Sequence, residues 1–235
     1  MKRITEVDAL RGIAILMMVA YHIIFDLEFL GIADIGLFSL PLVLFQRAIG
    51  SLFIMLAGVS VILSESANRE GFIHHAKRAA FLGVVALAIT LATWIYPHDA
   101  FITFGIIHFL ALSILIAPFF LRFGRSNAAF GLLVIFLGFW ASGLETDNGL
   151  LFWLGLIRAD YYALDFYPML PWFGVFLIGM AIGKTVFPRG EAIWKGPLIQ
   201  GKAADALAYA GRNSLIIYLA HQPILVGLML ILKII

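Results

Sequence analysis

Residues 9–30 read ALRGIAILMMVAYHIIFDLEFL, and this stretch decides the fold class. A helix of about 20 mostly apolar residues crosses the hydrocarbon core of a bilayer, and this stretch has that length and character. The apolar run that starts near Ala9 is too long for the apolar region of a secretory signal, and no small-residue cleavage site ends it. We therefore expect a first membrane-spanning helix here and no cleavable signal.

The same pattern recurs along the chain. About seven apolar segments are long enough to span a bilayer: 9–30, 42–63, 79–96, 105–121, 128–143, 169–187 and 213–232. Segment 149–157 is too short to span and is predicted to be a re-entrant or interfacial helix. Segment 202–211 is predicted to be a cytosolic amphipathic helix. Since no internal repeat is found, the sequence predicts an all-α fold: one polytopic transmembrane helical bundle, a single domain over residues 1–235.

The composition supports this fold class. Hydrophobic residues make up 63% of the chain and charged residues only 13%, and the mean hydropathy is +1.01. Soluble domains carry about 25% charged residues, so this composition is typical of a membrane protein. The chain has no cysteine, which excludes disulfides, thiol chemistry and cysteine-ligated metals.

Lysine and arginine gather in the loops of one predicted side, as is typical of the cytoplasmic side. That side collects Lys2, Arg3, Arg11, Arg69, Lys77, Arg78, Arg122, Arg125, Lys184, Arg189, Lys195, Lys202 and Arg212. The opposite loops hold the acidic residues Asp34, Asp99, Glu145, Asp147, Asp160 and Asp165, and the basic residues Arg158 and Lys233. We expect an integral protein of the plasma membrane of a prokaryotic cell, with the N-terminus inside and the C-terminus outside.

The first span carries ionisable residues, which cost about 2.5–3.5 kcal/mol each in a membrane and are functional candidates for that reason. His22 follows Arg11 by roughly three helical turns, so the two share a face about 16 Å apart along the axis. Asp26 lies one turn after His22, within reach of an imidazole nitrogen, and would hold one tautomer. Arg11 is expected at the cytosolic mouth and His22 in the outer half. This geometry suits a long ligand with an anionic head in the cytosol; the alternative for Arg11 is a topology signal that reaches the lipid headgroups.

Other spans add polar residues at a similar predicted depth, and each has a simpler alternative. Arg47 in the second span could be an interfacial side chain, and His108 and His221 could be hydrogen-bonded packing residues. Asp165 and Trp172 lie where the 169–187 span begins, and aromatic residues at that depth usually anchor a helix at the interface. Together these residues predict a polar cavity in the outer half. The remaining histidines, His74, His75 and His98, are expected in solvated loops.

Four segments resemble a known family: EVDALRGIAILMMVAYHIIFDL at 6–27, GSLFIMLAGVS at 50–60, FYPMLPWFGVFLIGMAIGK at 166–184 and GRNSLIIYLAHQPIL at 211–225. They resemble the catalytic-domain family of the heparan-alpha-glucosaminide N-acetyltransferases. More distantly, Arg11 followed by His22 after ten residues is similar to the Arg-x10-His signature of membrane acyltransferases that O-acetylate cell-surface glycans. The resemblance implies transfer of an acetyl or other acyl group from cytosolic acyl-CoA to an acceptor on the far side.

Carried onto this chain, the resemblance implies roles for Arg11 and His22, and the predicted geometry gives roles to the other candidate residues. Arg11 would bind the phosphates of acetyl-CoA, together with Arg122, Arg125 or Lys184, since arginine suits phosphate geometry. His22, oriented by Asp26, would be the general base on a hydroxyl or amine of a sugar or glycan acceptor. Arg47 or His108 would stabilise the oxyanion, and Asp165, Trp172 and His221 would line the substrate site. A covalent acyl-histidine and a homodimer are left open, and we expect no nucleic-acid partner.

Two other classes of function fit the same residues. Intramembrane histidine, aspartate and arginine also serve proton-coupled transporters and flippases, although neither inverted repeats nor paired broken helices are found. A cytochrome b could use His22, His108 or His221 as haem ligands. A metal site is not supported, because no pair of histidines with metal-ligand spacing occurs within a span. We expect neither a metal nor a haem as cofactor.

Overall fold

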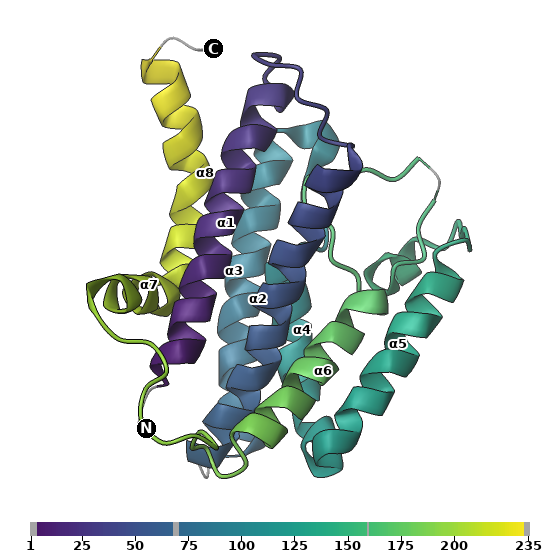
Figure 1. Cartoon of the computed structure of the whole chain (residues 1–235). Coiled ribbons are helices and arrows are strands. Elements are labelled where there is room, and N and C mark those ends of the chain that lie inside the picture. The colour runs from purple at the N-terminus through teal and green to yellow at the C-terminus, as the bar shows by residue number, and fades with distance from the viewer. Residues whose placement is uncertain (1–3, 68–70, 159, 233–235) are drawn as a thin grey trace. The chain divides into compact units, whose positions relative to one another are not determined.

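A computed structural model describes residues 4–67, 71–158 and 160–232, and over these residues the chain is helical with no strand. The α-helices are α1 (Thr5–Phe29), α2 (Leu40–Ala67), α3 (Phe72–Ile95), α4 (Ile106–Ile116), α5 (Asn127–Ala141), α6 (Met169–Val186), α7 (Lys202–Arg212) and α8 (Ser214–Ile231). Three 3-10 segments connect them: η1 (His98–Ala100), η2 (Ala117–Ser126) and η3 (Gly149–Leu154) (Figure 1). The predicted all-α helical bundle is confirmed.

Within the described residues, six helical stretches are long and apolar enough to cross a membrane. One of them, Ile106–Ala141, joins α4, η2 and α5, and its backbone leaves helical geometry at Gly124 (φ 53, ψ −119). Since a positive φ of this kind is readily adopted only by glycine, Gly124 is where the chain turns between α4 and α5. The expectation of about seven spans counts these two helices separately, and it stays a prediction.

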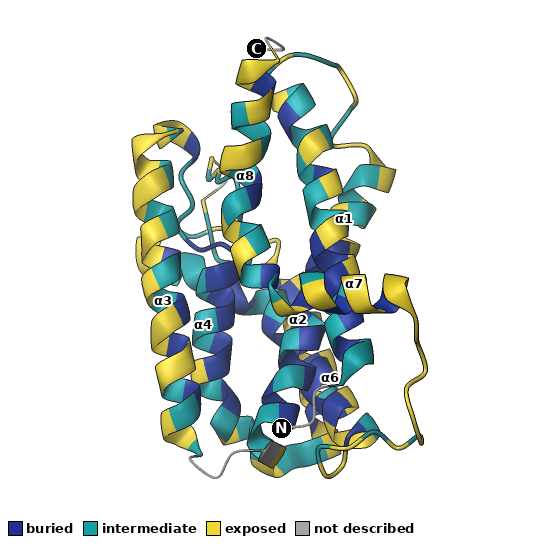
Figure 2. Ribbon diagram, turned by 90° about the vertical axis from the view of Figure 1, so that its left-hand side faces the viewer, coloured by how far each residue is buried: buried dark blue, intermediate teal, exposed yellow. Residues whose placement is uncertain are grey.

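The apolar surface of α3 shows why such a chain belongs in a bilayer. Phe81, Val84, Leu87 and Leu91 recur at helical spacing and are 58%, 68%, 62% and 65% exposed. Figure 2 shows the exposed residues of α3 following its length. In water such a stripe would be an aggregation site, whereas lipid chains cover it without cost. The protein is therefore an integral membrane protein.

The chain forms two compact units. The first contains Met1–Leu56 and Trp194–Ile235, and the second contains Ala57–Ile193. The predicted orientation rests on lysine and arginine residues, and four of these lie outside the described residues: Lys2, Arg3, Arg69 and Lys233. The cytoplasmic N-terminus and the single domain stay predictions.

In the first unit, α7 and α8 both pack against α1, and α7 lies across the N-terminal half of α1 (Figure 1). Glycines permit this approach, because a β-carbon on Gly12 would strike the backbone of Leu207 and one on Gly211 would strike the backbone of Asp8. The predicted amphipathic helix at 202–211 is thus found as α7. Its buried residues are Ala204, Ala208 and Gly211.

In the second unit, α5 and α6 pack closely in antiparallel directions. A β-carbon on Gly131 would approach Gly174, and one on Gly138 would approach Pro171, so the contact runs along both helices. Without water to drive helices together, such contacts between small residues supply the packing that holds membrane helices to each other. This pairing fixes where α6 begins and therefore where the loop before it lies.

We expect Gly211→Ala to lower the free energy of unfolding by about 1–3 kcal/mol, because the added methyl overlaps backbone atoms of α1 that cannot move independently. Thermal unfolding of the detergent-purified protein measures the effect. Gly227→Ala in α8 is the matched control, since its β-carbon meets nothing within 4 Å and alanine favours a helix. Equal destabilisation by the two variants would contradict close α1–α7 packing.

Candidate functional site

A polar cluster lies between α1 and α8 within the first unit. The ring centroids of His22 and His221 are 4.7 Å apart, with the ring planes at 56° to each other. Gln222 Nε2 donates a hydrogen bond of 2.5 Å to Asp26 Oδ1. Asp26 is 2% exposed and His221 is 9% exposed, whereas His22 and Gln222 are partly exposed, so one side of the cluster is buried. The structure therefore brings together three residues that the sequence singled out, namely His22, Asp26 and His221.

The expected hydrogen bond between Asp26 and His22 is not formed among the described residues. Asp26 instead pairs with Gln222 across the helix interface, and His22 Nδ1 is buried without a hydrogen-bond partner. The physical reason is that side chains one turn apart on a helix are close only if their rotamers converge, and a partner on the neighbouring helix offered better geometry. Asp26 therefore does not set the tautomer of His22.

The tautomer of His221 follows from its contact with the backbone of its own helix. His221 Nδ1 lies 2.5 Å from the carbonyl oxygen of Tyr218, and a carbonyl oxygen can only accept. Nδ1 therefore carries the proton, and Nε2 of the neutral ring carries the lone pair. Nε2 is buried and has no hydrogen-bond partner among the described residues. His221 thus presents an unused acceptor to the cluster.

Unsatisfied polar atoms concentrate at this one place. In the described part of the chain, seven buried side-chain nitrogen or oxygen atoms lack a hydrogen-bond partner, and four belong to this cluster. The four are His22 Nδ1, Asp26 Oδ2, His221 Nε2 and Gln222 Oε1. Each such atom costs about 1–3 kcal/mol when buried alone, so native proteins rarely gather several without a functional reason. The arrangement indicates a polar site that can bind water or a polar ligand.

Arg11 lies about three turns before His22 on the same helix. Its Nη1 donates to Asp8 Oδ1 at 2.9 Å, and the two side chains are 21% and 13% exposed. The pair lies beside the close contact of α7 with α1, where Gly211 meets the backbone of Asp8. Arg11 is thus a partly buried cation whose carboxylate neighbour holds it in place.

Arg47 of α2 also belongs to the first unit, and its side chain is exposed. This exposure agrees with the alternative of an interfacial side chain, because long basic side chains extend toward headgroups from apolar helices. A role in stabilising an oxyanion needs a donor in a water-excluded site. The exposed position of Arg47 gives that role no support.

The second unit contains His108, Asp165 and Trp172. His108 Nε2 lies 3.0 Å from Thr90 Oγ1, and Thr90 donates its own proton to the carbonyl of Ile102 at 2.7 Å. His108 Nε2 must therefore donate to Thr90, which leaves Nδ1 as the acceptor of the neutral ring. This bond between α3 and α4 is the hydrogen-bonded packing role considered above as the alternative for His108.

Asp165 caps a helix. Its Oδ2 accepts a hydrogen bond of 2.9 Å from the backbone nitrogen of Ile106, the first residue of α4. The bond satisfies one of the free N–H groups at a helix start and places a negative charge where the helix dipole favours it. The backbone nitrogen of Tyr167 bonds the carbonyl of Phe104 at 3.0 Å, which fixes the loop that presents Asp165. The carboxylate expected at the mouth of a cavity is thus occupied in ordering α4.

The aromatic residues around this loop pack on one another. Trp172 lies against Tyr167 with ring centroids 4.8 Å apart, in agreement with an anchoring role. The Tyr161 hydroxyl bonds Thr103 Oγ1. Burial raises the pKa of Tyr161 from its usual value, a change that the Thr103 bond opposes and the charge of Asp165 adds to. Tyr161 is therefore protonated at neutral pH.

Three basic residues predicted to bind a cofactor meet at one end of the second unit. Arg122 and Arg125 lie in η2 on either side of Gly124, and the Lys184 side chain of α6 runs beside Gly124. All three side chains are exposed, and the Arg122 guanidinium lies 4.7 Å from the ring centroid of Phe123. The structure thus assembles a basic patch from segments about 60 residues apart in the chain.

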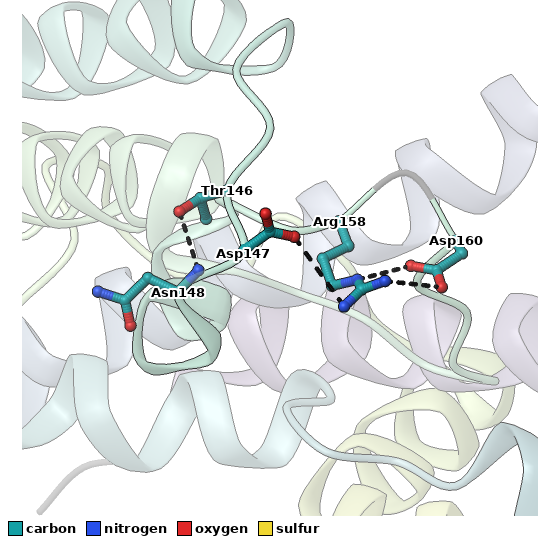
Figure 3. Close-up of polar contacts among 5 residues, drawn as sticks. All are labelled: Thr146, Asp147, Asn148, Arg158 and Asp160. Carbon is teal, nitrogen blue, oxygen red and sulfur yellow. Dashed lines mark hydrogen bonds and ion pairs between the residues drawn. The ribbon is translucent and has the colours of Figure 1, made fainter.

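A second polar group lies in the loops around η3. Arg158 lies between Asp147 and Asp160, at 4.0 Å and 3.1 Å, and Thr146 accepts a hydrogen bond from the backbone of Asn148 (Figure 3). An open cavity is lined by Glu145, Thr146, Asp147, Arg158 and Asp160. The ionic side chains are exposed, so these contacts are worth little energetically.

Sequence reasoning missed Gln222, Tyr218 and Thr90, which fix the orientation of the candidate residues. The expectation of solvated loops was also wrong for His74 and His75, which lie on α3. His74 Nε2 is 3.0 Å from Ser64 Oγ, and His75 is 1% exposed with its Nε2 3.2 Å from Glu65 Oε2. The motif YLAHQP contained Gln222 beside His221, and a polar side chain next to a histidine within a span was the available signal. Among the described residues, no three His, Cys, Asp or Glu side chains converge to hold a metal ion.

This integral membrane protein has neighbouring histidines on α1 and α8 and an arginine on α1, and so belongs to a restricted class in which polar groups inside the bilayer perform chemistry or transport. Residues 3–223 match the family model described as heparan-alpha-glucosaminide N-acetyltransferase, catalytic. The match covers most of the chain, so the chain belongs to this family and is a membrane acetyltransferase. The predicted resemblance is confirmed. Comparison with curated proteins and with solved structures gives no match.

We expect Gln222→Leu to lower the free energy of unfolding by about 1.5–3 kcal/mol, because it leaves the buried Asp26 carboxyl without its donor. Asp26→Leu combined with Gln222→Leu should recover most of that loss, since replacing both partners by apolar groups removes the unsatisfied atom. Thermal unfolding of the single and double variants forms the cycle, with Gln46→Leu at an exposed site as the control. Strict additivity would mean that the bond contributes nothing.

Proposed function

We propose that this protein transfers an acetyl or other acyl group from cytosolic acyl-CoA to a hydroxyl or amine of a sugar or glycan acceptor on the outer side of the membrane. The observation that carries the proposal is the cluster of buried, unpartnered polar atoms at His22, Asp26, His221 and Gln222. An acceptor alcohol or amine carries O–H or N–H groups that can donate hydrogen bonds to these atoms. The family supplies the reaction class.

His22 is the general base in this proposal. It takes the proton of the acceptor as the acceptor oxygen or nitrogen attacks the thioester carbon, and the carbon–sulfur bond then breaks. The thiolate of CoA leaves and is reprotonated by the imidazolium, so the base is regenerated in each cycle. A positioned general base contributes about 10²–10⁴-fold to rate. Asp26, held by Gln222, supplies a buried carboxyl group beside the imidazolium that forms.

Arg11 supports the donor end of the proposal. It lies on the same helix as His22, and eleven residues of helix span about 16 Å, which suits an extended pantetheine arm. Its ion pair with Asp8 holds the guanidinium ready, and a phosphate can replace or share that partner. The basic patch of Arg122, Arg125 and Lys184 is a further candidate for the nucleotide phosphates.

Proton-coupled transport uses the same residue types, and the experiments below separate it from acyl transfer. Shared haem ligation by His22 and His221 does not fit the geometry. Two imidazoles on opposite sides of one metal hold their ring centroids roughly 6 Å apart, because each metal–nitrogen bond is about 2 Å. The observed separation of the centroids is 4.7 Å.

We expect His22→Ala to reduce acyl transfer by at least about 10²-fold without loss of folded protein, because the base is removed and no neighbour on α1 replaces it. Sealed vesicles that contain labelled acetyl-CoA and face a mixture of outer glycans and amines measure the transfer. His98→Ala, an exposed histidine of η1, is the control and should retain full activity. Full turnover by His22→Ala would exclude His22 as the base, and solute uptake without acyl transfer by the unaltered protein would favour a transporter.

We expect Arg11→Gln to raise the KM for acetyl-CoA by about 10–100-fold with little change in kcat, since a charge-assisted contact to phosphate contributes about 1.5–3 kcal/mol. S-acetylpantetheine lacks the nucleotide phosphates, so its KM should be the same for the variant and the unaltered protein. Arg158→Gln, in an exposed ion pair, is the control for loss of a charge. An equal change of KM for both donors would show that Arg11 does not bind phosphate.

A further inference from the structure

We propose that His221 and His22 form a two-imidazole proton relay, in which one ring takes the proton of the acceptor and the other delivers it to the sulfur of CoA. This inference deepens the proposed function and rests on it. It assigns His221 a role in proton transfer in place of the substrate-lining role expected from the sequence. Gln222, the neighbour of His221, holds the adjacent carboxylate of Asp26.

The tautomer of neutral His221 is fixed by its hydrogen bond to the backbone. The Tyr218 carbonyl holds the proton on Nδ1, so Nε2 is an acceptor in every neutral state of the ring. An acceptor nitrogen repels an oxyanion, which excludes stabilisation of the oxyanion by neutral His221. The lone pair of His221 Nε2 is buried and has no hydrogen-bond partner among the described residues. Such a lone pair can instead accept a proton, as a general base does. His221 is therefore built to receive a proton at Nε2.

The rings of His22 and His221 lie close together, with their centroids 4.7 Å apart. No hydrogen bond joins the two rings among the described residues, so a proton passes between them through one intervening water. The pair holds one added proton at a time, because two adjacent imidazolium ions repel each other in a medium of low dielectric constant. The other titratable groups around the pair are Asp26, Tyr21 and Tyr218. Asp26 alone can carry a charge that favours the protonated pair.

The reaction itself has two points of proton transfer. Acyl transfer moves one proton from the acceptor to the departing thiolate while the carbon–sulfur bond breaks and a carbon–oxygen or carbon–nitrogen bond forms. The proton leaves one molecule and arrives on another, so two points of transfer are needed. A single imidazole serves both points only if both lie within reach of its ring, whereas two neighbouring rings can each serve one. No oxidant, reductant or further reactant is required.

The variant His221→Asn tests the relay. Asparagine places an N–H group where Nδ1 lies and can keep the bond to the Tyr218 carbonyl, but it offers nothing at the position of Nε2. We expect kcat for acyl transfer to fall by at least about 10²-fold, with the KM for acetyl-CoA and the thermal unfolding temperature unchanged. His98→Asn is the matched control, because His98 Nδ1 also bonds a backbone carbonyl, that of Trp94 at 2.9 Å, but its side chain is exposed.

A double variant separates a relay from two independent contributions. Groups that act as one unit are not additive, so His22→Asn with His221→Asn should lose no more activity than the worse single variant. Full activity of His221→Asn, losses that multiply in the double variant, or a lost kcat accompanied by a lowered unfolding temperature would each overturn the relay. A failure of the unaltered protein to transfer acyl groups would instead overturn the proposed function, which makes the two failures distinguishable.

Discussion

The hydrogen bond between Gln222 and Asp26 is the constraint on which the site depends. It joins α1 to α8 through a carboxyl group that is 2% exposed, where the loss of a hydrogen-bond partner is costly. Because Gln222 follows His221 directly, this bond also sets the rotation of α8 that turns His221 toward His22. The polar cluster is thus assembled by one interhelical contact, and the remaining lone pairs are left for a ligand.

Close approach of helix backbones supports this constraint. Gly12 and Gly211 let α7 lie against α1 near Arg11 and Asp8, while Gly131 and Gly174 do the same for α5 and α6. In a bilayer these contacts are a main source of helix association, because apolar side chains gain nothing by leaving lipid for protein. The apolar stripe on α3 shows the complementary case, a helix face that keeps its contact with lipid.

Much of the fold could be predicted because each membrane span is recognised from the residues of one continuous segment. A run such as 9–30 needs only length and apolarity to be recognised as a span, and the small, evenly spaced residues of 202–211 needed only helical periodicity. The candidate residues His22, His221 and Asp26 were found because ionisable groups are rare within spans. Their partners could not be found in this way. Whether Asp26 binds His22 or Gln222 depends on rotamers and on a helix almost 200 residues further along the chain.

The sequence by itself determined that this protein is a helical membrane protein of an acetyltransferase family with polar residues inside its first and last spans. Only the tertiary structure decided how those residues are used. In the structure the Asp165 carboxylate bonds the first turn of α4, and His108 bonds Thr90. His221 lies beside His22, and the proton of His221 is fixed on its Nδ1. The physical reason is that hydrophobicity is a property of each residue, whereas a hydrogen bond depends on where two chain segments meet.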